Sequence, residues 1–116
     1  MIYEITDENF EEEVAQSSVP CVIEFTGSWC ALCKKMAPSL EQLSEHYGDT
    51  VKICTVNTDD QKKLRIKFAV AALPYIVFIA DGMKSPLFDE YVTYERLKER
   101  IDFMLGGGQA PTTRPL

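Results

Sequence analysis

Residues 24–38 read EFTGSWCALCKKMAP and carry two cysteines, Cys30 and Cys33, that are separated by two residues. An apolar run, PCVIEF (20–25), leads into them and predicts a strand that is buried on both faces. From Cys30 to Tyr47 apolar side chains recur at spacings of three and four, which predicts a helix with one buried face. The two thiols are therefore expected where a buried strand ends and a helix begins.

Strands and helices are expected to alternate along the rest of the chain. Further strands are predicted at 2–5, 51–56 and 75–80, with a weaker one at 87–91, and further helices after Thr6, over 59–68 and after Thr93. Such alternation builds a parallel sheet with right-handed crossovers, and the two closing strands, joined by a short turn, should be antiparallel. The order predicts an α/β fold with a central mixed sheet of about five strands and helices on both faces.

The 116 residues suit a single domain, since domains commonly hold about 100–150 residues. We expect this domain to span residues 1–105. The last segment, GGGQAPTTRPL (106–116), is rich in Gly, Pro and Thr and is expected to be a disordered tail.

The balance of charge argues against nucleic acid as a partner. The formal net charge is −6, and the basic clusters CKK and QKKLRIK are short and mixed with other residues. No apolar segment approaches the roughly 18 residues that a membrane span needs. The first residues, MIYEITDENFEEEV, are acidic and do not resemble a secretory signal. We therefore expect neither nucleic acid nor a membrane as a partner, and we expect a cytoplasmic location.

Two cysteines at this spacing can bind zinc, form a structural disulfide or transfer electrons. A zinc site needs about four ligands, and the remaining candidates, Cys21, Cys54 and His46, lie in apolar strands or on the polar side of a helix. No metal site is therefore expected. A structural disulfide across so short a loop would remove little entropy from the unfolded chain. The spacing suits a bond that opens and closes.

The start of a helix is a favourable place for a reactive thiol. Unpaired amide N–H groups and the helix dipole favour an anion there, which lowers the pKa of Cys30 and makes it a thiolate nucleophile. Cys33 lies one turn further on, close enough to attack a mixed disulfide on Cys30. The pattern predicts a dithiol redox site, with Cys30 as the nucleophile and Cys33 as the resolving thiol.

The segment FTGSWCALCKKMAP resembles the active-site segment of thioredoxins, in which Trp-Cys-x-x-Cys-Lys leads into a helix that contains a proline, here Pro38. Downstream, ALPYIVFIADG (72–82) resembles the cis-proline and following strand of that family, with Pro74 as the cis residue. The stretch VNTDD (56–60) resembles the one after the third strand. The resemblance covers about residues 1–105 in order and spacing, and it implies the thioredoxin fold and a redox activity.

The chain departs from the usual pattern of this family at several positions. Ala31 and Leu32 replace the Gly-Pro pair between the cysteines, Thr26 replaces a tryptophan, and Glu90 replaces a glycine that borders the partner groove. Thr55 stands where a lysine usually partners a buried carboxylate. The resemblance is therefore to an atypical thioredoxin.

The buried carboxylate that the resemblance implies is Glu24, six residues before Cys30. Burial disfavours the charged form, so its pKa should be raised. Glu24 is then expected to accept the proton of Cys33, through water, as the mixed disulfide resolves. The alternative is a structural role with one hydrogen bond at a strand end.

Three further residues are assigned to partner binding by the resemblance. The backbone of Leu73, before cis Pro74, is expected to pair with a bound substrate peptide, as in strand addition. Trp29 is expected to shield the disulfide and contact partners, with a plain core role as the alternative.

The expected function is that of a thiol–disulfide oxidoreductase that reduces disulfides in partner proteins and so serves electron transfer and redox homeostasis. Nothing in the chain resembles a flavin or nicotinamide site, so no cofactor is expected and a separate reductase must recycle the dithiol. Ala31 and Leu32 add no positive charge beside Cys30, which favours a reductant. Glu24 and the altered dipeptide leave a thiol oxidase or disulfide isomerase open. A thioredoxin-fold binding module without catalysis is the alternative from another class.

The remaining cysteines, Cys21 and Cys54, are expected to stay free. If Glu24 and Thr55 face each other on adjacent parallel strands, Cys54 lies beside Ile23, two residues from Cys21. Strands about 4.8 Å apart with a rise of about 3.3 Å per residue separate the two cysteine Cα atoms by about 8 Å, beyond the roughly 7 Å limit for a disulfide.

Overall fold

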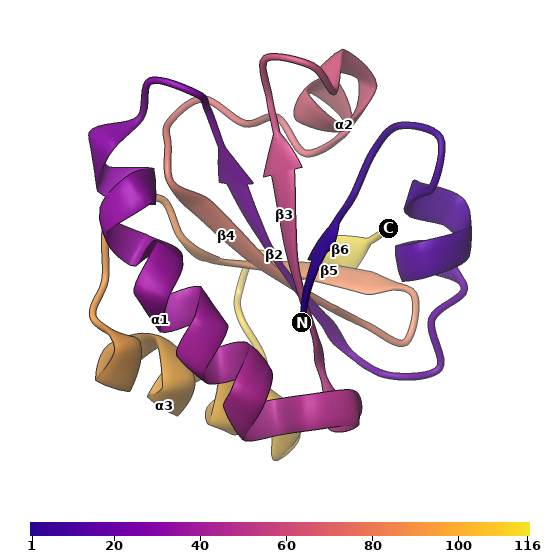
Figure 1. Cartoon of the computed structure of the whole chain (residues 1–116). Coiled ribbons are helices and arrows are strands. Elements are labelled where there is room, and N and C mark those ends of the chain that lie inside the picture. Colours follow the sequence, from indigo (N-terminus) through magenta and orange to yellow (C-terminus); the bar gives the residue numbers. More distant parts are fainter.

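The computed structural model describes all of residues 1–116 and contains one six-stranded sheet with the order β1-β3-β2-β4-β5-β6 (Figure 1). The strands are β1 (Ile2–Glu4), β2 (Cys21–Thr26), β3 (Lys52–Asn57), β4 (Tyr75–Ala80), β5 (Met83–Phe88) and β6 (Arg114–Pro115). The helices are the π-helical η1 (Glu11–Ala15), α1 (Ala31–Tyr47), the 3₁₀ turn η2 (Gly48–Thr50), α2 (Lys62–Lys67) and α3 (Tyr94–Leu105). The mixed α/β architecture expected from the sequence is confirmed.

The first three strands are parallel, as their alternation with helices predicts. β3 lies between β1 and β2 and runs parallel to both, whereas β4 is antiparallel to β2 and to β5. The expected antiparallel pair of closing strands is confirmed. Its second strand covers residues 83–88 instead of 87–91, because the positive-φ residues Asp81 and Gly82 turn the chain directly after β4.

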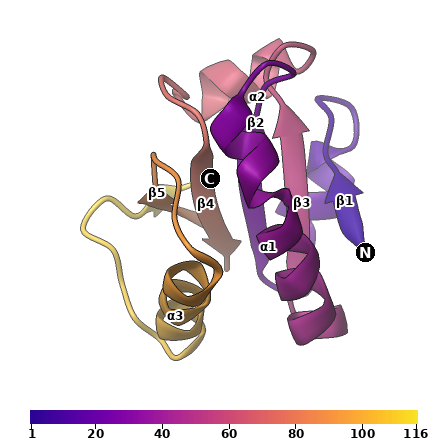
Figure 2. The ribbon, with the colours of Figure 1, turned by 60° about the vertical axis from the view of Figure 1, so that its left-hand side comes forward.

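Two apolar cores lie on opposite faces of the sheet. One contains side chains of α1 and α3, including Leu40, Leu43 and Leu97, and the other contains Phe10, Leu64 and Phe68 from the η1 and α2 side. Figure 2 shows α1 and α3 standing together on one side of the sheet. Successive side chains of a strand point to opposite faces, so β2 supplies both cores and is buried along almost its whole length.

The register of β2 and β3 agrees with the expected one. Glu24 is paired with Thr55 and Ile23 with Cys54, while Cys21 lies opposite Lys52. Cys21 and Cys54 are both free and fully buried. The predicted absence of a disulfide between them is therefore confirmed in this structure.

The C-terminal segment differs from the expectation of disorder. Residues 114–115 form β6 against β5, and the Leu116 N–H donates to the Gly82 carbonyl at 2.8 Å. Ala110 is buried, and the hydroxyls of Thr113 and Ser85 are 2.8 Å apart. This segment pairs with the first two residues of β5, Met83 and Lys84, which would otherwise lie at the open edge of the sheet. The composition of this segment predicted disorder because it contains no information about the backbone hydrogen bonds that β5, distant in sequence, makes with it.

Candidate active site

Cys30 is the N-terminal cap of α1. Its backbone is extended, and its sulfur accepts a hydrogen bond from the backbone N–H of Cys33 at 3.2 Å. The two cysteines form a disulfide with their Cα atoms 5.3 Å apart. Cys30 is 9% exposed and Cys33 4%. The first sulfur therefore lies at the positive end of the helix dipole, where an anion is stabilised, and the second lies deeper.

The loop before Cys30 is held by Asp59, at the end of the neighbouring strand β3. One Asp59 carboxylate oxygen accepts hydrogen bonds from the Ser28 N–H at 3.0 Å and the Ser28 hydroxyl at 2.7 Å. These two bonds hold the pKa of Asp59 below its ordinary value. Sequence reasoning did not assign Asp59 to the site. Asp59 follows β3 and Ser28 follows β2, and the carboxyl ends of adjacent parallel strands meet at one edge of a sheet. This placement could have indicated that the two residues lie close together.

Glu24 lies on the face of β2 that α1 covers, together with Cys33. The Glu24 side chain is 2% exposed, and its Oε2 atom has no hydrogen-bond partner. Glu24 and Cys33 both line a cavity of about 280 Å³, whose charged lining also includes Lys34 and Glu41. Burial raises the pKa of Glu24 from 4.5 to about 7. Thr55, on the adjacent strand, supplies no positive charge to offset this effect.

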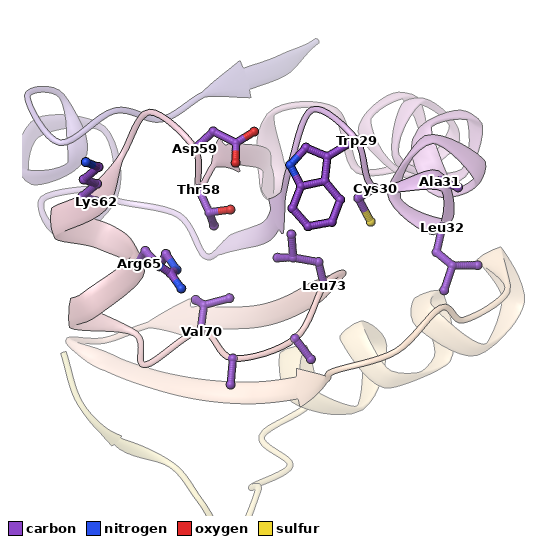
Figure 3. Close-up of a pocket in the computed structure, with 12 residues that line it drawn as sticks. Trp29, Cys30, Ala31, Leu32, Thr58, Asp59, Lys62, Arg65, Val70 and Leu73 are labelled. Carbon is purple, nitrogen blue, oxygen red and sulfur yellow. The ribbon is translucent and has the colours of Figure 1, made fainter.

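A groove of about 650 Å³ opens beside Cys30 (Figure 3). Trp29 and Leu73 line it, and Trp29 is 78% exposed, which excludes a core role for this indole. The peptide bond between Leu73 and Pro74 is cis, as expected, and Pro74 is buried. A Cβ atom on Gly27 would lie 3.1 Å from Leu73 Cδ1, so the absence of a side chain at Gly27 lets Leu73 approach the active-site loop.

The structure thus brings together the six residues expected to form the site, in two neighbouring spaces. Cys30, Trp29 and Leu73 line the groove, with Pro74 next to Leu73, while Cys33 and Glu24 line the cavity behind the disulfide. The groove continues past Leu73 to Lys62 and Arg65 of α2, which sequence reasoning did not assign to the site.

Neither a metal cluster nor a membrane-spanning helix occurs in this fold. No three His, Cys, Asp or Glu side chains lie close enough together to hold a metal ion. None of the helices combines the length and apolar character that crossing a bilayer requires.

Comparison with known proteins identifies a family model and several relatives that the chain resembles in sequence. The family model described as Thioredoxin matches residues 1–103. Thioredoxin X, chloroplastic, of Arabidopsis thaliana is 36% identical over 106 residues, which cover 90% of this chain and 58% of the relative. Thioredoxin C-2 of Corynebacterium nephridii is 36% identical over 81 residues, covering 70% and 75%. A thioredoxin of Rickettsia typhi is 27% identical over 104 residues, covering 90% and 96%. The chain therefore spans less than two thirds of the plant relative's length.

Proposed function

The chain belongs to the thioredoxin family, and from that premise we propose that it reduces disulfide bonds in partner proteins through Cys30 and Cys33. Family membership and the paired cysteines support the class of thiol–disulfide oxidoreductases. The observation that carries the proposal is the position of the Cys30–Cys33 bond: at the N-terminus of α1, with Cys30 on an open groove.

The proposed reaction transfers two electrons and two protons to the partner. The Cys30 thiolate attacks one sulfur of the partner disulfide, forming a mixed disulfide, and the partner's other sulfur leaves as a thiolate that takes up a proton. Cys33 then loses its proton and attacks the Cys30 sulfur. The partner's second sulfur leaves and is protonated, so the partner holds two thiols and the chain holds the Cys30–Cys33 disulfide.

Glu24 is proposed as the base that accepts the Cys33 proton through water. Both residues line the same cavity, and the unpartnered Glu24 oxygen has a free acceptor site there. With a pKa of about 7, a substantial fraction of Glu24 is ionised at neutral pH, as a general base requires. Because the ionised fraction rises with pH, the resolving step should accelerate between about pH 6 and pH 8.

Reduction is the direction that the residues beside the cysteines favour. Ala31 and Leu32 provide no cation that would stabilise the Cys30 thiolate and make the disulfide a strong oxidant. Thiol oxidation or disulfide isomerisation is the second candidate, favoured by the buried Glu24 without a lysine partner. A reductant needs a reducing compartment, so a cytoplasmic location is part of the proposal.

A separate reductase is assigned the step that reduces the Cys30–Cys33 disulfide again after each turnover.

An insulin-reduction assay with dithiothreitol tests the proposal. The wild-type chain should accelerate precipitation of the insulin B chain, and the Cys30→Ser variant should not. Cys33→Ser should accumulate mixed disulfides with partner proteins, because the resolving thiol is missing. If the wild-type chain binds such partners but does not accelerate reduction, the chain is a binding module and the proposal is wrong.

The redox potential of the Cys30–Cys33 couple against glutathione separates the two catalytic directions. A value near that of thioredoxin, about −270 mV, supports a reductant, whereas a value near −120 mV is typical of a strong oxidant.

A further inference from the structure

The groove beside Cys30 carries unpaired positive charge at its far end. Lys62 and Arg65 line it from α2, and neither belongs to an ion pair. Figure 3 shows both at the end away from Cys30, with Trp29 and Leu73 in between. A segment that reaches Cys30 along this groove therefore passes two cations that form no ion pair within the chain.

The positive charge of α2 contrasts with the acidic character of the whole chain. The helix sequence KKLRIK holds four of the chain's twelve basic residues and no acidic residue, whereas the formal net charge is −6. In this helix only Leu64 is buried. The cations are thus not required for packing, and they stand at the surface next to the candidate active site.

Asp59 is the one acidic residue in the groove lining. One oxygen of its carboxylate accepts two hydrogen bonds from Ser28, and its negative charge offsets part of the positive charge of Arg65. The remaining charges in the groove are Lys62 and Arg65, and the lining as a whole is positive by one charge.

We propose that the groove selects protein disulfides whose flanking residues are acidic, with the acidic side chains bound by Lys62 and Arg65. This inference rests on the proposed function and specifies its substrate class. The apolar part of the groove, formed by Trp29 and Leu73, receives the residues next to the partner cysteine. The cations then discriminate between partners by charge, because complementary charges speed encounter and like charges repel.

Three synthetic peptides with the same internal disulfide, flanked by glutamate, glutamine or lysine residues, test the substrate class. The rate constant for reduction of each by the reduced full-length chain is measured at low salt from the release of peptide thiols. We expect the glutamate peptide to react about fivefold faster than the glutamine peptide, and the lysine peptide more slowly than either. The preference should shrink at about 0.5 M salt, where the Debye length is short.

Two double variants test whether Lys62 and Arg65 in the groove cause the preference for the glutamate peptide. K62Q/R65Q should lower the ratio of glutamate-peptide to glutamine-peptide rates to near one. K63Q/K67Q makes the same charge change on the same helix outside the groove lining, and it should keep the ratio. Equal rates for all three peptides with the wild-type chain, or an unchanged ratio in K62Q/R65Q, would overturn the inference.

Binding measured without electron transfer separates this inference from the proposed function. Peptides with serine in place of both cysteines are titrated into the oxidised chain, and the shifts of α2 amide resonances give the affinity. A chain that binds the glutamate peptide most tightly but reduces none of the disulfide peptides contradicts only the reductase function. A chain that binds all three serine peptides equally contradicts the charge selection.

Discussion

The chain contains two pairs of cysteines that differ in local structure and in exposure. Cys30 and Cys33 lie within one turn at the start of α1, and Cys30 lines an open groove. Cys21 and Cys54 lie on adjacent parallel strands, fully buried among apolar side chains. A hydrogen bond with Cys21 and burial raise the pKa of the Cys54 thiol well above its ordinary value.

The difference shows that local structure, more than residue type, determines the chemistry of a thiol. A helix N-terminus supplies N–H groups and a dipole that stabilise a thiolate, and a spacing of three residues brings a second sulfur within bonding distance. A strand interior supplies neither, and in the β2–β3 register Cys21 and Cys54 form no disulfide. The two pairs should therefore respond to substitution in opposite ways.

The largest expected effect follows from replacing the nucleophile. Cys30→Ser should lower the rate of insulin reduction by at least about 100-fold, because the reaction loses the atom that forms the mixed disulfide. Cys21→Ala is the matched control and should keep the rate. A Cys30→Ser variant with substantial activity would mean that another thiol attacks the partner, and the contrast between the two pairs would fail.

The second largest effect on activity is expected from Glu24, whose carboxylate lies near the Cys30–Cys33 pair and not near a second reactive thiol pair. Glu24→Gln should slow reduction by about 10- to 100-fold at pH 8, because the general base for Cys33 is lost. The resolving step of the variant should also no longer accelerate between pH 6 and pH 8, as measured from the decay of the mixed disulfide in single-turnover reaction with a peptide disulfide. An unchanged pH profile would remove Glu24 from the reaction.

The same substitution should change stability in the opposite direction. Because the folded-state pKa of Glu24 is raised, the protonated form is favoured in the fold, and the associated stability is lost as pH rises from 4.5 through about 7. Glu24→Gln should therefore increase the free energy of unfolding at pH 8 by up to about 3 kcal/mol, with little change below pH 4.5. Urea denaturation at both pH values measures this difference. A variant less stable than the wild type at pH 8 would mean that the charge of Glu24 is compensated in the fold.

A smaller effect is expected from the residue that holds the active-site loop. Asp59→Ala removes both hydrogen bonds to Ser28 and should lower the reduction rate by about three- to tenfold, since Cys30 and Trp29 would be less well positioned. Asp60→Ala is a neighbouring control, because no hydrogen bond of the Asp60 side chain is found. Equal rates in both variants would show that the loop keeps its position without Asp59.

The smallest effect on activity is expected from the buried pair. Cys21→Ala and Cys54→Ala should each cost about 1 kcal/mol of stability, since both thiols behave as small apolar side chains, and should leave reduction unchanged. Thiol titration in denaturant should find two free thiols in the oxidised chain and four in the reduced chain. A count of zero in the oxidised monomer would contradict the register of β2 and β3.

Strongly local patterns in the sequence predicted most of the fold and the centre of the site. The apolar run of β2, the helical periodicity of α1 and the spacing of Cys30 and Cys33 each depend on neighbouring residues, and all were found as expected. The pairing of Glu24 with Thr55 also followed, because the family resemblance fixed one register and the strand period fixed the rest.

Features that depend on distant segments were not predicted. The antiparallel direction of β4 beside β2, the added strand β6 and the Asp59–Ser28 contact all join residues far apart in sequence. Hydrophobic periodicity reports which face of an element is buried but not which element covers it. The cations of α2 carry no periodic signal, and only the folded chain brings Lys62 and Arg65 into the groove that leads to Cys30.

The short outer strands of the sheet also bear on self-association. β1 has three residues and β6 has two, and Pro115 in β6 has no N–H to offer to a further strand. A protein whose Leu73 backbone is expected to pair with a substrate peptide must avoid pairing with copies of itself. The two terminal strands therefore offer few backbone groups to a further strand, and residues 85–88 of β5, which β6 does not cover, include Pro86, which also lacks an N–H.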